Sequence, residues 1–270
     1  CITRGGMGAI YEVAHVETRA RSALKILLPE LLHSAEMKAR FRQEALVTAA
    51  IQSDHIAKVF DGGMTVQGRP YFVMEYVKGI PVTEYCDQAC LSIDDRLGLF
   101  AQVCLAVQHA HQKGIVHRDI KPDNIFVVRA HGRESVRILD FGIARAKSAA
   151  SLHAGQSTMG NGVDAFTPRY AAPEQWLPKR FGQTGPWTDV WGLALTMVEA
   201  LTGEPPIGGN DDVATMMGIA LDPAFRPTPR LLGAEVPDGV EQAFHRALAV
   251  DPRERTQSIE VFWTEIGRAH

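Results

Sequence analysis

The stretch His117-Arg118-Asp119-Ile120-Lys121-Pro122-Asp123-Asn124 places a carboxylate, an ammonium group and a side-chain amide at fixed short offsets. A phosphoryl transition state spreads negative charge over oxygens that must be held in line, so its catalysis depends mainly on positioning and electrostatics. Asp119 can accept the proton of an attacking hydroxyl, and Lys121 can neutralise charge on the transferring group. Asn124 can bind a magnesium ion through its carbonyl oxygen. The stretch therefore predicts a phosphoryl-transfer site.

Further motifs accompany this stretch in a fixed order. A lone His-Arg-Asp triplet is usually a turn with a surface ion pair, so the assignment depends on the other motifs. These are Ala23-Leu24-Lys25, Glu44, Asp140-Phe141-Gly142 and Ala172-Pro173-Glu174. The combination resembles the protein kinase family, in its serine/threonine branch, and most closely the bacterial members of that branch. The resemblance runs from Cys1 to about Gly267.

The resemblance implies an α+β, protein-kinase-like fold of two lobes. A small lobe with an antiparallel β-sheet and one helix is expected at residues 1–74, a hinge at 75–81, and a larger, mainly helical lobe at 82–270. The first strand is expected to be cut short, with the chain beginning inside the domain. Residues 1–270 are therefore predicted to form one kinase catalytic domain.

The composition is that of an ordinary globular protein, with 46% hydrophobic and 22% charged residues. A net charge of -3 gives no reason to expect binding to nucleic acid or to an anionic membrane. No apolar run is long enough to span a bilayer, and no signal peptide is evident. We expect a cytoplasmic location and no membrane contact for this stretch of chain.

The four cysteines, at positions 1, 86, 90 and 104, form no CxxC pair and match no histidine cluster at zinc spacing. Cys86 and Cys90 could share a helix face, but reduced thiols are the expected state. His109 and His111 fall in a helical stretch, where packing explains them. No structural metal is predicted.

Three glycines, Gly5, Gly6 and Gly8, stand close together near the start of the chain. In a hairpin turn, glycines leave the backbone amides bare, so that these amides can approach nucleotide phosphates where side chains would clash. The stretch resembles the glycine-rich loop of kinases, and the first glycine of the family pattern falls on Thr3. A β-branched residue there is tolerated if its backbone stays extended, and costs roughly 1–2 kcal/mol if a positive φ is required.

Residues 22–28 are predicted as a strand that carries Lys25. Residues 35–50 are predicted as a helix, because apolar side chains such as Phe41 recur there at helical spacing. Glu44 borders the apolar stripe of that helix and is well placed to meet Lys25. The resemblance implies that Glu44 holds Lys25 toward the α- and β-phosphates of ATP.

Two further strands are predicted at residues 56–62 and 70–76, the second leading into the hinge. By resemblance, Met74 lies at the back of the adenine pocket, while the Glu75 carbonyl and the Val77 backbone pair with the adenine edge. The other nucleotide-binding residues that the resemblance implies are Gly5, Gly6, Gly8, Ile10, Ala23, Lys25 and, as the floor beneath the adenine, Phe126.

A long helix is predicted to begin at Ser92 and to lead toward the catalytic stretch. Residues 125–128 and 136–139 have the β-branched, apolar character of a short hairpin. Its two strands present Asn124 and Asp140 on either side of a site for two metal ions.

Between residues 142 and 172 the composition changes to Ala, Ser, Gly and Thr, which is typical of a functional loop. The resemblance makes this the activation segment, with Arg118 receiving a phosphate that the segment carries. Thr158 is the preferred phosphosite. The Thr167 hydroxyl is implied to tie the substrate platform to the catalytic loop, although Phe166 replaces the usual preceding glycine. The other candidate phosphosites are Ser148, Ser151 and Ser157.

Residues 188–201 are predicted as an apolar helix. The resemblance implies that this helix lies at the centre of the larger lobe and that Asp189 accepts hydrogen bonds from the backbone of the catalytic loop, residues 117–124. Arg255 matches the arginine that pairs with Glu174 in the family. A buried pair of that kind costs about 3–5 kcal/mol to break on one side only.

The resemblance implies transfer of the γ-phosphoryl group of ATP to serine or threonine hydroxyls of proteins, with Mg²⁺, or Mn²⁺ in its place. Lys121, two residues past Asp119, favours serine or threonine over tyrosine as the acceptor. The expected partners are protein substrates, among them a second copy of the chain through autophosphorylation in trans. The catalytic set is Lys25, Glu44, Asp119 and Lys121.

Two alternatives remain open. The first is a pseudokinase, an ATP-binding scaffold module that keeps the fold but not the chemistry, since folds host many functions. The second is a kinase-like enzyme for a small molecule. Such enzymes typically lack the peptide platform, so Thr167 with Ala172-Pro173-Glu174 counts against it.

Overall fold

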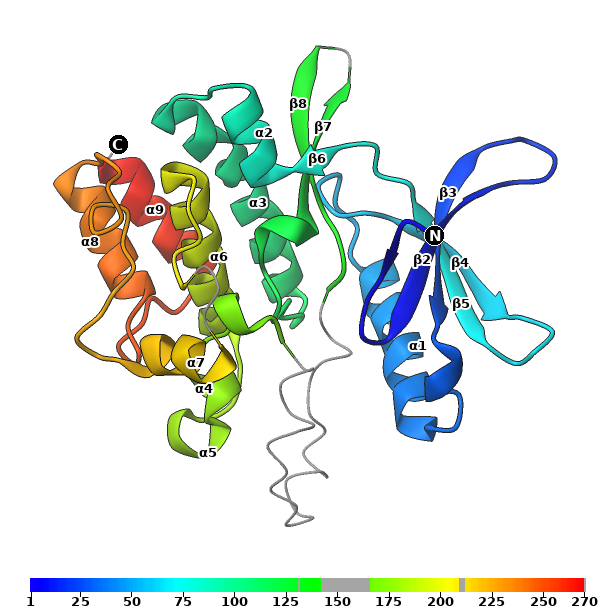
Figure 1. Cartoon of the computed structure of the whole chain (residues 1–270). Helices are drawn as coiled ribbons and strands as arrows, with labels where there is room; N and C mark the ends of the chain where they lie inside the picture. The colour runs from blue at the N-terminus through cyan, green and yellow to red at the C-terminus, as the bar shows by residue number, and fades with distance from the viewer. Residues whose placement is uncertain (131, 142–165, 209–211, 270) are drawn as a thin grey trace.

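The computed structural model describes residues 1–130, 132–141, 166–208 and 212–269. Figure 1 shows two lobes, with a β-sheet and helix α1 on one side and a group of helices on the other. A small second sheet, formed by β6, β7 and β8, lies between them. The two-lobed α+β fold predicted from the sequence is confirmed.

The small lobe is built on an antiparallel sheet with the strand order β1-β2-β3-β5-β4. Strand β5 buries every second side chain, including Phe72 and Met74, because successive residues of a strand face opposite sides of the sheet. The strands predicted at 22–28 and 70–76 are confirmed to within one residue at each end. The five strands are β1 Thr3–Arg4, β2 Gly8–Ala14, β3 Arg21–Leu27, β4 Val59–Met64 and β5 Pro70–Glu75.

Helix α1 (Ala35–Ala50) follows a short 3-10 turn, Pro29–Leu31, and covers one face of that sheet. Its N-terminus is capped by Ser34, whose hydroxyl accepts a hydrogen bond from the Met37 N–H at 3.1 Å. The Phe41 ring packs on Phe72 of β5 with 5.1 Å between ring centroids. The predicted helix at 35–50 is therefore confirmed.

The large lobe surrounds helix α6 (Pro186–Thr202), in which 13 residues are buried. This matches and slightly extends the helix predicted at 188–201. Helix α3 begins as predicted, with the Ser92 hydroxyl accepting from the Asp95 N–H at 3.2 Å. The other described helices are α2 Val82–Gln88, α3 Ile93–Gln112, α4 Pro173–Trp176, α5 Pro178–Phe181, α7 Val213–Leu221, α8 Asp238–Ala247 and α9 Ile259–Ala269, with a 3-10 turn at Pro168–Tyr170.

The second sheet joins the two lobes. Its strands are β6 (Ile80–Pro81), β7 (Ile125–Ala130) and β8 (Arg133–Ile138), and all pairings are antiparallel. The 3-10 turn Pro122–Asn124 leads directly into β7. The predicted hairpin is confirmed, with strands longer than the 125–128 and 136–139 expected.

The strand predicted at 56–62 is wrong at its start, since β4 begins only at Val59. Ile56 forms a parallel bridge with Ile138 of β8 instead. The Ala57 N–H donates to the Ile138 carbonyl at 3.0 Å, and the Ile138 N–H donates to the His55 carbonyl at 2.8 Å. The backbone of residues 55–57 is therefore bonded to the large lobe rather than to the small-lobe sheet.

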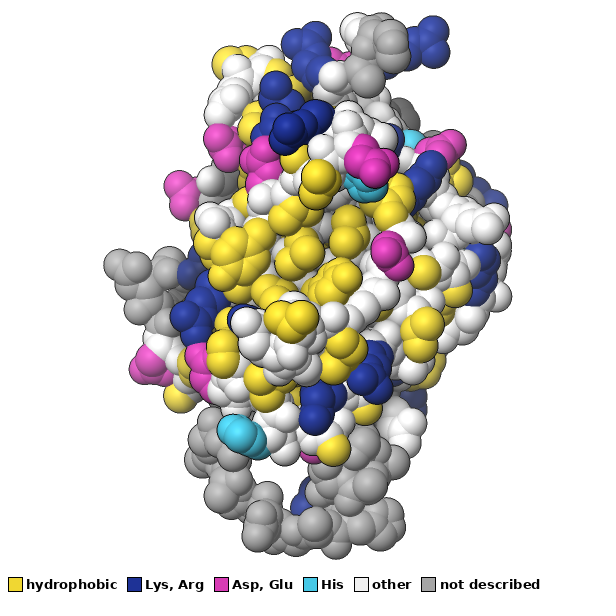
Figure 2. All heavy atoms as spheres, turned by 90° about the vertical axis from the view of Figure 1, so that its right-hand side faces the viewer, with side chains coloured by type: hydrophobic (Ala, Val, Ile, Leu, Met, Phe, Trp, Pro, Cys, Tyr) yellow, Lys and Arg dark blue, Asp and Glu magenta, His cyan; other side chains and the backbone are white. Residues whose placement is uncertain are grey.

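Figure 2 views the molecule from the small-lobe side and shows hydrophobic side chains gathered over the middle of that face. The exposed apolar side chains of the small lobe include Tyr11, Leu46, Phe60 and Met64. Among the described residues, no helix is long and apolar enough to cross a membrane.

Candidate active site

Lys25, on strand β3, joins two carboxylates from distant parts of the chain. Its Nζ lies 2.5 Å from Glu44 Oε1 on α1 and 3.0 Å from Asp140 Oδ1, which follows β8. Lys25 and Glu44 are both buried, at 8% and 4% exposure. The sequence-predicted residues Lys25, Glu44 and Asp140 are thus brought together between the lobes.

The charge of Lys25 is stabilised at this position. Burial alone would lower its pKa, because desolvation disfavours the charged form. The Asp140 and Glu44 carboxylates outweigh the burial and raise the pKa above its ordinary value. Lys25 therefore remains a cation over the whole physiological pH range, as binding to phosphate oxygens requires.

The Asp119 carboxylate faces Thr167. Asp119 Oδ1 accepts hydrogen bonds from the Thr167 N–H at 3.1 Å and from the Thr167 hydroxyl at 2.8 Å. Lys121 Nζ donates to the same hydroxyl oxygen at 2.9 Å and lies 3.8 Å from Asp119 Oδ2. One threonine hydroxyl therefore connects the carboxylate and the ammonium group.

Asn124 and Asp140 lie at neighbouring ends of the β7–β8 hairpin. The Leu139 N–H donates to the Asn124 carbonyl at 2.8 Å, which fixes their relative position. The Asn124 amide nitrogen donates to the Asp119 carbonyl at 2.8 Å. No group of three or more His, Cys, Asp or Glu side chains among the described residues is arranged to hold a metal ion. An amide oxygen and a carboxylate nevertheless fit Mg²⁺, which typically takes one or two protein oxygens and completes its shell with phosphates and water.

The backbone before Asp119 is held by Asp189 of α6. Asp189 Oδ2 accepts from the His117 N–H, and Oδ1 from the Arg118 N–H, both at 2.7 Å. Arg118 has a φ of +66° and Asp140 a φ of +45°, conformations that side-chain-bearing residues rarely adopt. Such strain persists because the surrounding hydrogen bonds fix it, so Asp189 stabilises the shape of the catalytic loop.

One contact to Asp189 differs from the sequence-based interpretation. The sequence explains His111 by packing, but its Nε2 lies 2.7 Å from Asp189 Oδ2. Asp189 therefore accepts from a side chain of α3 as well as from two backbone amides. The sequence carried no local signal for this contact, since it joins positions 78 residues apart.

Arg118 directly precedes Asp119, and part of its guanidinium is buried. Among the described residues, its Nε has no hydrogen-bond partner, while Gln175 Nε2 donates to its backbone carbonyl at 2.9 Å. Burial lowers the pKa of Arg118, although Asp189 acts in the opposite direction. A buried, unpaired donor favours an anionic partner. Thr158, the preferred phosphosite, lies outside the described residues, as do Ser148, Ser151 and Ser157.

The glycine-rich stretch forms the turn between β1 and β2. The Gly5 N–H donates to the Gly8 carbonyl at 2.9 Å, which closes the turn around Gly6. Thr3 pairs with Ile10 in an extended strand. Its backbone therefore needs no positive φ, and the cost that a β-branched residue would have there does not arise. A Cβ on Gly8 would lie 3.1 Å from the Ile26 carbonyl oxygen, which favours glycine at that position.

The remaining residues that the sequence predicts for nucleotide binding lie on strands of the two sheets. In the small-lobe sheet, Ile10 pairs with Lys25 and Ala23 with Met74, so all four positions lie on adjoining strands. Glu75 ends β5, and Phe126 lies on β7 of the large lobe.

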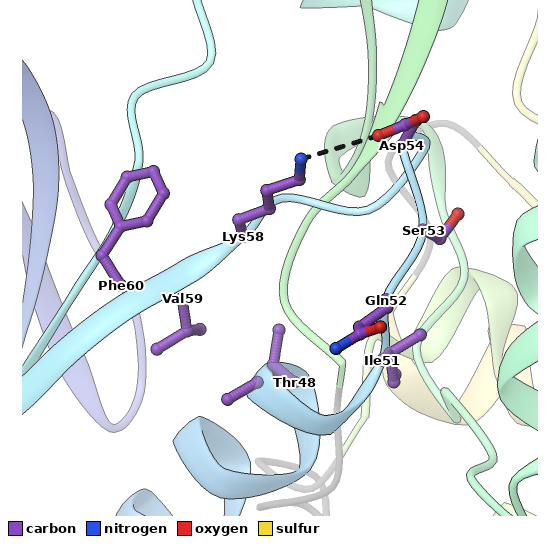
Figure 3. Close-up of a pocket in the computed structure, with 9 residues that line it drawn as sticks. Thr48, Ile51, Gln52, Ser53, Asp54, Lys58, Val59 and Phe60 are labelled. Atoms are coloured by element: carbon purple, nitrogen blue, oxygen red, sulfur yellow. Dashed lines mark ion pairs between the residues drawn. The ribbon is translucent and has the colours of Figure 1, made fainter.

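A cavity of about 460 Å³ lies at the end of α1 and the start of β4 (Figure 3). Its walls include Ile51, Gln52 and Phe60, with an ion pair of 3.5 Å between Lys58 and Asp54. No residue of the Lys25, Glu44 and Asp140 group lines it. The cavity is therefore separate from the candidate active site.

The chain around Thr167 is anchored by aromatic and charged contacts. Phe166, in place of the usual glycine, packs edge-on against Trp176 with 4.8 Å between ring centroids. Glu174 pairs with Arg255, and both side chains are fully buried. These contacts fix the backbone on both sides of Thr167.

The chain has two lobes, a buried Lys25–Glu44 pair and a loop at residues 117–124 whose backbone Asp189 holds. This is the arrangement of a protein kinase catalytic domain. Residues 1–262 match the family model for the protein kinase domain, and the chain belongs to that family.

The chain is similar to bacterial serine/threonine kinases, as the sequence analysis predicted. The chain is 37% identical over 260 residues to the serine/threonine-protein kinase Pkn1 of Myxococcus xanthus, covering 96% of this chain and 36% of that protein. It is 34% identical to PknA of Mycobacterium tuberculosis, covering 95% of this chain and 57% of that protein. The crystal structure of the M. tuberculosis PknI kinase domain matches with a TM-score of 0.72 at 26% identity, covering 100% of this chain and 94% of that one. The chain thus spans between about a third and somewhat over half of the two curated relatives.

Proposed function

We propose that this chain is a serine/threonine protein kinase that transfers the γ-phosphoryl group of ATP to hydroxyl groups of proteins. The observation that carries the proposal is the contact of Asp119 and Lys121 with one hydroxyl, that of Thr167. The Asp119 carboxylate and the Lys121 ammonium thus converge on one place, beside a platform that a peptide can use. The serine/threonine-protein kinases similar to this chain support the same activity.

The proposed reaction is an in-line displacement at phosphorus. The acceptor hydroxyl oxygen forms a bond to the γ-phosphorus while the bond from that phosphorus to the β–γ bridging oxygen breaks, and ADP leaves with the electron pair. Asp119 accepts the hydroxyl proton, and Lys121 balances charge on the transferring group. Lys25, held by Glu44, binds the α- and β-phosphates.

The proposed ATP site uses the junction of the lobes. Gly5, Gly6 and Gly8 cover the phosphates, while Ile10, Ala23, Met74 and Phe126 enclose the adenine between the Glu75 carbonyl and the Val77 backbone. Asn124 and Asp140 hold Mg²⁺, or Mn²⁺ in its place. The metal ion, when bound, neutralises phosphate charge.

Regulation is proposed to follow from Arg118. Its unpaired Nε, among the described residues, favours a phosphate on the activation segment, with Thr158 as the preferred acceptor. A second copy of the chain could supply that phosphate in trans. Mass spectrometry of fully active protein that found only unmodified segment would contradict this regulation.

The test uses the purified chain with γ-labelled ATP, Mg²⁺ and a generic basic protein substrate. We expect label on serine or threonine, and none with Asp140→Ala. Asp119→Asn should lower turnover by about 10²- to 10⁴-fold while ATP still binds, because the general base is lost and the nucleotide contacts remain. Near-normal turnover of that variant would overturn the role of Asp119.

The alternative is a scaffold that binds ATP without transferring phosphate. Bound ATP with no labelled product in the same assay would favour it. The Asp119 carboxylate beside the Thr167 hydroxyl argues against it, because phosphoryl transfer needs a general base and ATP binding alone does not.

A further inference from the structure

The lobes are connected by residues 75–81, called the connection below. The β7–β8 hairpin of the large lobe contacts both of its ends. At the exit of the connection, Ile80 and Pro81 of β6 pair with Val127 and Phe126 of β7 through the backbone. Gly79 lies so close that a Cβ there would clash with the Val127 carbonyl oxygen. The exit is therefore fixed to the hairpin by main-chain packing.

The entry of the connection is held by a side chain instead. Arg137 Nε of β8 donates to Glu75 Oε1 at 3.2 Å, and both side chains are more than two-thirds buried. Arg137 is the cross-strand partner of Phe126, so both side chains lie on the same face of the hairpin. The Arg137 Nη1 also donates to the Ser135 hydroxyl at 2.9 Å and to the Val136 carbonyl at 3.1 Å, which fixes the guanidinium.

The Glu75 carboxylate is bonded on its other oxygen as well. Oε2 accepts from the Lys58 N–H at 3.3 Å, while the Glu75 N–H donates to the Lys58 carbonyl at 2.8 Å. The Lys58 ammonium pairs with Asp54 at 3.5 Å, as Figure 3 shows, and so is engaged by another carboxylate. Arg137 is thus the cation that ties Glu75 to the large lobe.

We infer that Arg137 is a positioning residue for adenine recognition: through Glu75 it sets the backbone of the connection against the hairpin that carries Phe126. This inference rests on the proposed function, in which the Glu75 carbonyl and Phe126 both meet the adenine. The Arg137–Glu75 pair therefore governs the distance between the adenine edge contacts and the adenine floor. It does not touch the groups that act on the γ-phosphoryl.

The experiment compares Arg137→Gln with the matched control Arg129→Gln. Arg129 lies on the same hairpin and pairs with Glu134 at 3.3 Å, but it does not contact the connection. Calorimetry would measure the Kd of ATP and of inorganic tripolyphosphate, which lacks the adenine, and assays would give KM for ATP and kcat. Circular dichroism and the thermal midpoint would check that each variant is folded.

We expect Arg137→Gln to raise Kd and KM for ATP by about 5- to 10-fold, which is the effect expected from losing one interaction between two residues in contact. The kcat and the Kd of tripolyphosphate should be unchanged. Arg129→Gln should match the wild type. Glu75→Gln should weaken ATP binding similarly, and adding Arg137→Gln to it should have little further effect, because one interaction is lost in either case.

Unchanged ATP affinity in a folded Arg137→Gln variant would overturn the inference and leave the kinase proposal standing. Equal weakening of tripolyphosphate binding would also overturn it, because the loss would then not be specific to adenine. A wild-type chain that binds no ATP would overturn the proposed function and this inference together.

Discussion

Glu174 and Arg255, 81 positions apart, form a doubly hydrogen-bonded ion pair with neither side chain exposed to solvent. The two contacts measure 2.9 and 3.1 Å. Thr188 donates to the same carboxylate at 2.7 Å, and the guanidinium lies over the Trp191 ring at 5.0 Å from its centroid. The pair thus connects helix α4, helix α6 and the segment before α9.

Breaking this pair on one side should be strongly destabilising. Arg255→Met leaves the buried Glu174 carboxylate without its partner, so we expect the free energy of unfolding to fall by about 3–5 kcal/mol. Replacing both residues with apolar ones removes the uncompensated charge, so the double variant Glu174→Met with Arg255→Met should lose less than Arg255→Met alone. Urea unfolding followed by circular dichroism measures both.

The control for this prediction is Arg253→Gln, which removes the neighbouring, exposed pair of Arg253 with Asp251 at 2.6 Å. Its unfolding midpoint should match that of the wild type, because exposed pairs contribute little to stability. A double variant less stable than Arg255→Met would contradict the role of the uncompensated charge.

Acid should destabilise the fold through His117. Burial lowers its pKa below the ordinary 6.5, although Asp189 and Asp119 act in the opposite direction. Its Nδ1 accepts from the Asp119 N–H at 3.2 Å, and the ring packs on Phe141, so the neutral form fits the site. The unfolded chain then binds the proton more tightly, and stability should fall as the pH drops below 6.5.

Denaturant unfolding across that pH range would measure this dependence. His117→Phe keeps an aromatic ring beside Phe141 and removes the titrating group, so its stability should depend less on pH below 6.5. His33→Gln, at an exposed site before α1, should keep the wild-type dependence. A His117→Phe variant with the full wild-type dependence would refute the assignment.

Much of the site could be predicted because its parts lie in short motifs. Asp119, Lys121 and Asn124 lie within six residues of one another. The apolar stripe that contains Phe41 was enough to predict that Glu44 faces Lys25. The Arg137–Glu75 pair could not be predicted in this way, because it joins positions 62 apart and depends on how two separate sheets meet. The late start of β4 was missed for a similar reason, since Ile56 is apolar enough for a strand and only its contact with Ile138 decides its pairing.

The cysteines provide a simple test of the core. Cys86 and Cys104 are buried, and burial raises the pKa of Cys86 to about 11 and that of Cys104 further still. Cys1 and Cys90 are exposed. Because the thiolate is the reactive form, Ellman's reagent should modify only the two exposed thiols quickly in the native chain and all four after unfolding. Rapid reaction of a third thiol in the native chain would contradict the packing of α2 or α3.

His111 should influence turnover although it lies outside the motifs. It contacts the Asp189 carboxylate that also holds the His117 and Arg118 amides, so His111→Phe removes one of three donors to that carboxylate. The strained φ of Arg118 is then less firmly fixed, and we expect kcat to fall by about 3- to 10-fold with little change in KM for ATP. His109→Phe is the matched control on the same helix, because His109 Nε2 has no hydrogen-bond partner in the described part of the chain. Equal losses of kcat in both variants would show that α3 packing, and not the contact with Asp189, is responsible.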